Sequence, residues 1–144
     1  MLKAKTVLAA IALALQASAA FADGLVTHNG SLMEVIKLSF DTVEIRYVQP
    51  RPGLWEIGVR PGTVLLRGKW VGPTLYATAV VFSGECAPIP YPVSGFVDQN
   101  NLLVLQGPSP WVDPYTCRVL GPGAPHNSTL VFEPLQVPVY GRGQ

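Results

Sequence analysis

Prolines and glycines are so frequent in this chain after residue 23 that they indicate many turns and few helices. Fourteen prolines and fourteen glycines all lie after residue 23. Between them are short runs rich in β-branched and aromatic residues, such as VEIRYV at 43–48 and TVLLRGKW at 63–70. Apolar and polar side chains alternate in these runs, which is typical of half-buried strands, and no stretch keeps a helical apolar stripe for three turns. We therefore predict an all-β fold.

The runs predict about eight short strands in a single antiparallel meander. Asn29-Gly30 fits a type I′ hairpin turn, and Pro52-Gly53 and Pro61-Gly62 fit type II turns, because glycine accepts the positive φ that these turns require. Such a meander protects its edges by closing into a small barrel or by folding into a sandwich, and the pattern leaves both open. Residues 108–125 carry few strand signals and predict a long loop. Alternation in 63–70 predicts that Leu65 and Leu66 lie on opposite faces.

The first 22 residues have the three parts of a secretory signal peptide. Lys3 and Lys5 precede nine uninterrupted apolar residues, and Ala20-Phe21-Ala22 then provides an A-x-A cleavage site. The apolar run is too short to span about 30 Å of hydrocarbon. We predict a cleaved signal peptide over 1–22, a single all-β domain over 23–144, a periplasmic or extracellular location, and no stable membrane insertion after cleavage.

The charge of the predicted mature chain is close to zero. Without Lys3 and Lys5, eight of the ten Lys and Arg residues remain against nine Asp and Glu, which gives a net charge of −1. A nucleic-acid partner is disfavoured because no excess of basic residues is present. We expect a monomer that binds no nucleic acid.

Cys86 and Cys117 are the two cysteines, and both lie in the part predicted to be exported. In an oxidising compartment such a pair is most simply a disulfide. Its closure of the intervening chain would stabilise the fold by roughly 3–4 kcal/mol on a chain-entropy basis. A catalytic or metal-binding thiol is the alternative, but neither a C-x-x-C pair nor an adjacent histidine supports it.

The two histidines occur in similar phrases, HNGSLMEV at 28–35 and HNSTLVFE at 126–133. A metal site needs three or four converging ligands, and the spacing specifies no carboxylate or thiol to join His28 and His126. We interpret both phrases as strand starts beside turn-favouring asparagines, which would be neighbours if the sheet closes. We predict no metal site and no cofactor.

Catalytic signatures are weak throughout the sequence. The contexts of the cysteines do not resemble those of a nucleophile with an orienting base, and no G-x-S-x-G motif is present. Paired carboxylates for glycosidic chemistry stay open, but no two of the nine acids are singled out. We expect a protein without catalytic residues, and we place an enzyme third among the alternatives.

Arg51 and Arg60 each precede a Pro-Gly turn, and Trp55 lies between them. If both turns are at one end of the fold, two guanidinium groups and an indole would share a rim that suits a carboxylate or a sugar acid. The alternative is that the arginines are merely solvated at the shoulders of turns.

The ordered phrases HNGSLMEV, IRYVQPRPGL, GVRPGTVLLRG, VSG and NSTLVFE resemble a small family of exported β-domains from soil and plant-associated α-proteobacteria. A similar segment occurs at the C-terminus of larger caspase-like bacterial proteins. The resemblance covers nearly the whole chain after residue 23. It implies a module that accompanies other domains and carries no activity over to this chain, since the caspase Cys–His context is missing here.

We therefore expect an exported, non-enzymatic binding module that recognises a protein, a peptide or an envelope glycan through its end loops. One alternative is a small barrel that carries an apolar ligand in an interior left open by Ala77, Ala79 and Gly95, although small residues also permit tight packing. Another is an inhibitor of an exported hydrolase, an idea that rests on analogy between folds.

Overall fold

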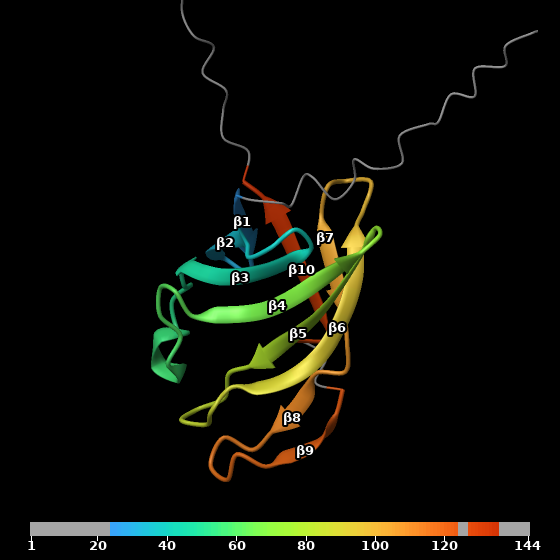
Figure 1. Ribbon diagram of the computed structural model, residues 1–144. Coiled ribbons are helices and arrows are strands. Elements are labelled where there is room, and N and C mark those ends of the chain that lie inside the picture. The colour runs from blue at the N-terminus through green and yellow to red at the C-terminus, as the bar shows by residue number, and fades with distance from the viewer. Residues whose placement is uncertain (1–23, 124–126, 136–144) are drawn as a thin grey trace, which may run out of the picture.

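The computed structural model describes residues 24–123 and 127–135, and within them the chain forms a closed antiparallel barrel of eight strands (Figure 1). The order around the barrel is β1-β10-β7-β6-β5-β4-β3-β2, and β8 pairs with β9 in a separate two-stranded sheet. The prediction of an all-β meander is confirmed, and the barrel rather than the sandwich is formed. The strands are β1 Gly24–His28, β2 Ser31–Lys37, β3 Thr42–Gln49, β4 Val64–Val71, β5 Thr74–Val81, β6 Ile89–Val97, β7 Leu103–Gln106, β8 Pro110–Val112, β9 Val119–Pro122 and β10 Thr129–Pro134.

The barrel closes where the first strand meets the last. Strand β1 pairs with β10 through Val26 opposite Pro134 and Thr27 opposite Glu133. Every barrel strand therefore has two neighbours, and the exposed edges of an open sheet are removed. Among the described residues, no helix is long and apolar enough to cross a bilayer. The predicted signal peptide lies outside the described residues.

The turns follow the chemistry of their residues. Asn29 and Gly30 both have positive φ, at 46° and 78°, and His28 pairs with Ser31 across them, as a type I′ hairpin requires. The amide of Thr63 donates to the carbonyl of Arg60 at 3.0 Å around the Pro61-Gly62 turn, in which Gly62 has φ 91°. The predicted turns are confirmed. His28, however, ends β1 rather than beginning a strand, because the tight turn follows it directly.

Large apolar side chains fill the barrel interior. A β-bulge between β3 and β4 pairs Ile45 with Leu66 and Arg46 with Val64, so that Leu65 is the extra residue. Leu65 and Leu66 are both buried, and the prediction that they lie on opposite faces was wrong for this reason. The largest fully buried apolar side chains are Phe132, Met33, Ile45, Leu66, Leu75, Leu103, Leu105 and Val59.

Small residues let neighbouring strands approach closely. A β-carbon added to Gly95 would lie 1.8 Å from the carbonyl oxygen of Val104 on β7, and one added to Gly68 would lie 2.7 Å from Cβ of Ala77. Ala79 is completely buried. These residues therefore serve close packing of the strands.

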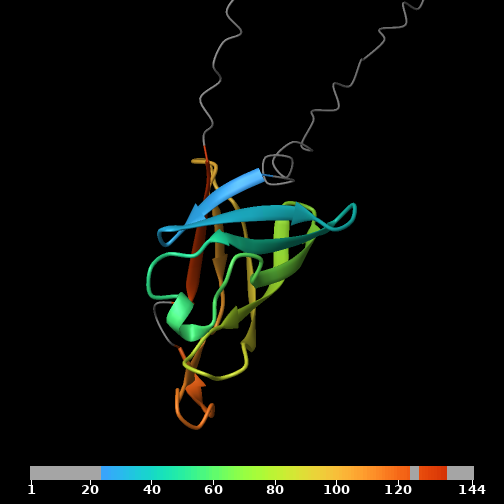
Figure 2. The same cartoon turned by 90° about the vertical axis from the view of Figure 1, so that its left-hand side faces the viewer.

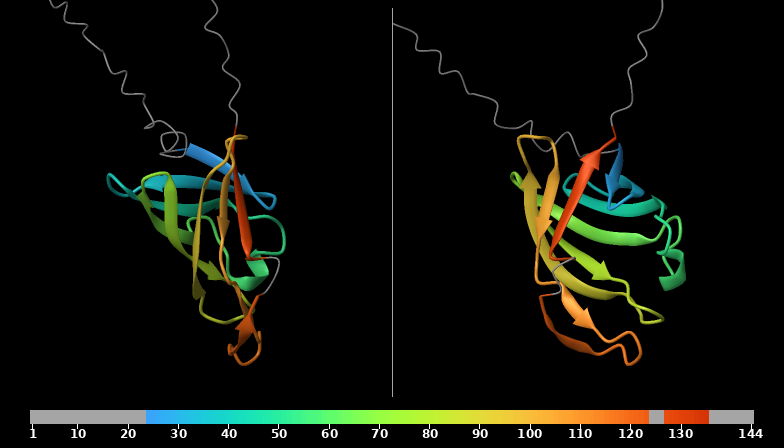
Figure 3. Two further views of the ribbon diagram at one scale, coloured as in Figure 1. Left: turned by 90° about the vertical axis from the view of Figure 1, so that its right-hand side faces the viewer. Right: turned by 180° about the vertical axis from the view of Figure 1, so that it is seen from behind.

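Residues 108–125 contain a hairpin where the sequence predicted only a loop. Strands β8 and β9 pair around a turn in which the Asp113 carboxylate accepts hydrogen bonds from the amides of Tyr115 and Thr116, at 2.8 and 3.1 Å. The hairpin extends from the barrel (Figure 3). The sequence did not predict these strands because each contains a proline, at position 110 or 122, and proline within a run argues against a strand unless it lies at an edge or an end.

Candidate functional site

The two ends of the barrel differ in the length of their connections. At one end the strands are joined by short turns, at 38–41, 72–73 and 98–102. At the other end the connections run through 50–63, 82–88 and 107–128, and they include the 3-10 helix η2, Trp55–Ile57, and the β8–β9 hairpin. Figure 2 shows η2 on the loop beside the barrel. We call this the long-loop end.

The disulfide between Cys86 and Cys117 ties two of these long connections together, as predicted. Its Cα atoms are 5.4 Å apart, and it links the β5–β6 loop to the β8–β9 hairpin. The sulfur of Cys86 also faces the carbonyl oxygens of Asp113 and Pro114, at 3.8 and 3.7 Å. The hairpin is thus fixed relative to the barrel.

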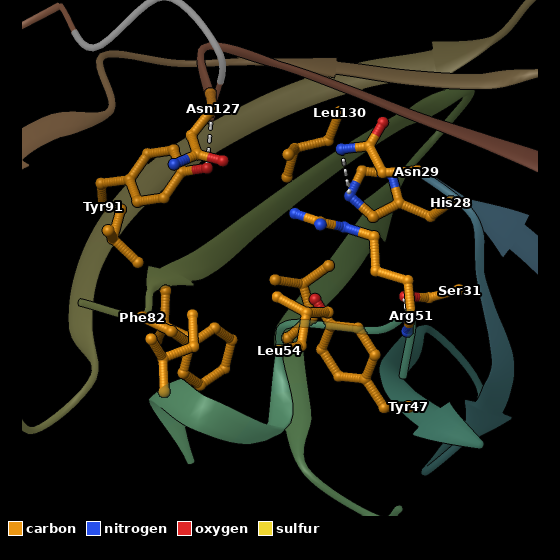
Figure 4. A pocket seen from close by; sticks show the side chains of 14 residues that line it. His28, Asn29, Ser31, Tyr47, Arg51, Leu54, Phe82, Tyr91, Asn127 and Leu130 are labelled. Atoms are coloured by element: carbon orange, nitrogen blue, oxygen red, sulfur yellow. Dashed lines mark hydrogen bonds between the residues drawn. The ribbon is translucent and has the colours of Figure 1, made fainter. Parts of the chain in front are cut away.

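A pocket of about 200 Å³ opens at the long-loop end (Figure 4). Half of its fourteen lining residues are polar, and none carries a carboxylate. We call this hollow the Arg51 pocket, because Arg51 provides its one permanently charged side chain. The polar lining residues are His28, Asn29, Ser31, Tyr47, Arg51, Tyr91 and Asn127, and the apolar ones are Leu54, Ile57, Leu65, Val80, Val81, Phe82 and Leu130.

The β1–β2 hairpin holds Arg51 in place. The amide of Arg51 donates to the buried hydroxyl of Ser31 at 2.9 Å, and a β-carbon added to Gly30 would contact the stem of Arg51 at 3.8 Å. The guanidinium group extends over the pocket beside His28 and Asn29 (Figure 4). It forms no ion pair with any described residue.

His28 forms one wall of the Arg51 pocket. Its ring stacks on Phe132 with centroids 4.7 Å apart, and its Nδ1 lies 2.9 Å from the carbonyl oxygen of Val131. A carbonyl can only accept, so Nδ1 carries the proton and Nε2 is the acceptor of the neutral ring, 3.5 Å from Nδ2 of Asn29. Burial lowers the pKa of His28, the Val131 carbonyl raises it by less, and the charge of Arg51 lowers it again.

Two tyrosines stay protonated within the pocket. Burial raises the pKa of Tyr47 to about 12, Arg51 opposes this shift, and Tyr91 adds to it. Burial also raises the pKa of Tyr91, whose hydroxyl donates to the carbonyl of Asn127 at 2.7 Å. The buried Ser109 hydroxyl acts in the opposite direction, but its effect on the pKa of Tyr91 is smaller than that of burial. Both phenols are therefore neutral hydrogen-bonding groups near pH 7.

A groove of about 360 Å³ adjoins the Arg51 pocket and shares Ile57 and Phe82 with it. We call it the Trp55 groove. The Arg60 guanidinium lies 4.5 Å above the Trp55 ring, and its Nη1 donates to the Trp55 carbonyl at 2.6 Å. Arg60 is thus held by cation–π and hydrogen-bond contacts within its own loop.

The predicted rim is therefore arranged as two adjoining hollows. The structure brings Trp55 and Arg60 into contact, whereas Arg51 lines the neighbouring pocket. Sequence reasoning missed the part that His28, Tyr47, Tyr91 and Asn127 have in this site. The Asn29-Gly30 turn was the one local signal, since it places His28 at an end of the barrel.

No group of three or more His, Cys, Asp and Glu side chains converges among the described residues. His126 lies outside them, so the expectation that it neighbours His28 stays a prediction. Comparisons of the chain with protein-family models, with curated proteins and with solved structures find no match. The resemblance to the exported α-proteobacterial β-domains stays a prediction.

Proposed function

We propose that this protein is an exported, non-enzymatic binding module that recognises a partner protein or peptide through its long-loop end. The observation that carries the proposal is the concentration, at one end of a closed barrel, of long connections, two adjoining hollows and an arginine that forms no ion pair with a described residue. Among the described residues, the connections at the opposite end are short turns. Loops placed by a rigid scaffold are the usual location of binding residues.

Exposed aromatic side chains support the same assignment. Trp55, Trp111 and Tyr115 all lie on the long connections, with 49%, 48% and 94% of their surfaces exposed. Aromatic and arginine side chains dominate the energetics of protein interfaces. The disulfide would pre-organise this surface and thereby reduce the entropy lost on binding. It also agrees with a periplasmic or extracellular location, where disulfides persist.

The position of the pocket disfavours the apolar-ligand alternative. Phe132, Met33 and Leu105 fill the interior, and the Arg51 pocket lies at the end of the barrel with half of its lining polar. Its volume of about 200 Å³ is below the roughly 300–1,000 Å³ of pockets that enclose drug-sized ligands. A small terminal group of a larger partner fits this volume better.

Photo-crosslinking from the two barrel ends tests the proposal. A benzophenone amino acid is placed at Trp55, at the long-loop end, or at Phe40 in the turn between β2 and β3, which is the more exposed of the two at 93% against 49%. We expect one defined partner to crosslink from position 55 in the producing cells and again when purified. Equal crosslinking of that partner from position 40, or none from position 55, would contradict the proposal.

A second candidate, an inhibitor of an exported hydrolase, is favoured by the β8–β9 hairpin. Tyr115 is 94% exposed near the tip of this hairpin, which the Cys86–Cys117 disulfide braces. Braced loops insert into clefts at a low entropic cost. Inhibition constants of the wild type and of Tyr115→Ala against a panel of secreted proteases and glycosidases test this role, and the absence of any inhibition would remove it.

A further inference from the structure

The charge of the Arg51 pocket identifies the kind of group that it binds. Arg51 lines the hollow without an ion-pair partner among the described residues, and no lining residue is acidic. By contrast, Arg46 and Arg67 both pair with Glu44 on the barrel wall. A planar guanidinium with free donors is matched to a carboxylate, which it binds through two parallel hydrogen bonds.

The apolar lining identifies what accompanies this carboxylate. Seven aliphatic or aromatic side chains line the hollow together with the polar ones, among them Leu54, Val81 and Phe82. A sugar acid carries hydroxyl groups around its whole ring, so those facing these apolar side chains would be buried without hydrogen bonds, which is unfavourable. A carboxylate attached to an aliphatic side chain fits both parts of the lining.

The adjoining Trp55 groove provides a path for the rest of such a ligand. It shares Ile57 and Phe82 with the Arg51 pocket, and it is open and larger, at about 360 Å³. A chain that ends in the pocket would cross these two residues and continue past Trp55. A small pocket that adjoins a larger and more open groove suits the last residue of an extended peptide.

We propose, building on the function proposed above, that the Arg51 pocket binds the C-terminal residue of a partner peptide. The terminal carboxylate pairs with the Arg51 guanidinium, and an aliphatic last side chain contacts the apolar lining. Ser31 is a positioning residue, because its hydroxyl holds the amide of Arg51. The hydroxyl of Tyr47 and the amide of Asn29, which both line the pocket, supply further neutral donors to the carboxylate.

The test titrates the oxidised full domain with three probes, and binding is monitored by the chemical shifts of the backbone amides in solution. The probes are acetyl-Gly-Gly-Leu with a free carboxylate, the same peptide with a C-terminal amide, and glucuronate. With the acid peptide we expect saturable shifts of the amides of 28–31 and 51. The peptide amide should bind at least about tenfold more weakly, because it lacks the charged hydrogen-bonded pair with Arg51. Glucuronate should also bind at least about tenfold more weakly, because it lacks the aliphatic side chain that contacts the apolar lining.

Matched variants locate the site. Arg51→Gln should weaken binding of the acid peptide by at least about tenfold, whereas Lys37→Gln, which removes the same charge from an exposed site at the opposite end of the barrel, should leave it unchanged. Ser31→Ala should weaken it less than Arg51→Gln. Equal binding of acid and amide, tighter binding of glucuronate, no response to Arg51→Gln, or no saturable shifts would each overturn the inference. If the inference fails in this way but the partner still crosslinks from position 55 in Arg51→Gln, the proposed binding function remains and only the assignment of the Arg51 pocket to a peptide C-terminus is lost.

Discussion

The Nδ1 atom of His28 lies 2.9 Å from the carbonyl oxygen of Val131, and this hydrogen bond joins the first barrel strand to the last. The same imidazole stacks on Phe132 inside the barrel and lines the Arg51 pocket on its other side. One side chain therefore takes part both in the contact between the first and last strands and in the site. This coupling allows stability measurements to report on the pocket.

His28 should make stability depend on pH. Its pKa is lowered in the folded protein, chiefly by burial, so that the unfolded chain binds a proton at a higher pH than the folded one. Stability from this source is complete above the ordinary value near 6.5 and is lost as the pH falls from there through the folded pKa. We expect the urea midpoint to fall between pH 7 and pH 5, and His28→Asn, which retains a donor near Val131, to remove part of that fall. An identical pH profile in the variant would contradict this prediction.

Glu44 should stabilise the barrel through its two arginines. It faces outward from β3 but is completely covered, and it accepts hydrogen bonds from Arg46 and from Arg67, whose Nε lies 2.8 Å away. Burial acts to raise the pKa of Glu44, but the hydrogen bonds and charges of Arg67 and Arg46 lower it overall. Glu44→Gln should reduce the free energy of unfolding by about 1–3 kcal/mol, since hydrogen bonds to charged groups are lost.

The matched control for Glu44 is Glu34→Gln on β2, which removes a carboxylate that forms no ion pair with a described residue. Chemical denaturation at pH 7 should separate the two variants. The effect of Glu44→Gln should diminish in acid below the ordinary pKa of a glutamate, as the wild-type carboxylate also becomes protonated. Equal stabilities of the two variants at pH 7 would contradict the prediction.

Gly95 should tolerate no side chain. A β-carbon there would lie 1.8 Å from the Val104 carbonyl oxygen, and that atom belongs to the backbone of the neighbouring strand and cannot rotate away. Gly95→Ala should therefore cost about 3 kcal/mol or more, at the upper end of overpacking effects. Ser94→Ala, at the adjacent exposed position, should cost less than about 1 kcal/mol. Thermal denaturation of both variants measures the difference, and similar midpoints would contradict the close approach of β6 and β7.

Reduction of the Cys86–Cys117 disulfide should loosen the long-loop end before the barrel. The cross-link closes a loop with a sequence separation of 31, which corresponds to roughly 3–4 kcal/mol on a chain-entropy basis. We expect amide exchange of the β8–β9 hairpin to accelerate in Cys86→Ala/Cys117→Ala, while the amides of β2 and β3 stay protected. Uniform acceleration over the whole barrel would show instead that the cross-link acts on global unfolding alone.

The sequence by itself determined the features that depend on neighbouring residues. Alternation of apolar side chains predicted the strands, because successive residues of a strand face opposite sides. Asn29-Gly30 and Pro61-Gly62 predicted their turns, because only certain residues accept positive φ. The disulfide could be predicted from the sequence, because Cys86 and Cys117 are its two cysteines.

The tertiary structure alone decided how these elements close and what they enclose. Barrel and sandwich share the same local pattern, and the choice appears only where β1 meets β10. The bulge at Leu65 and the burial of Glu44 depend on the register of β3 with β4. The Arg51 pocket assembles His28 from β1, Arg51 from the β3–β4 connection and Tyr91 from β6, and the partners His28 and Val131 are 103 positions apart. No local pattern encodes such a contact, because it forms only when the ends of the chain are brought together by the packing of the whole barrel.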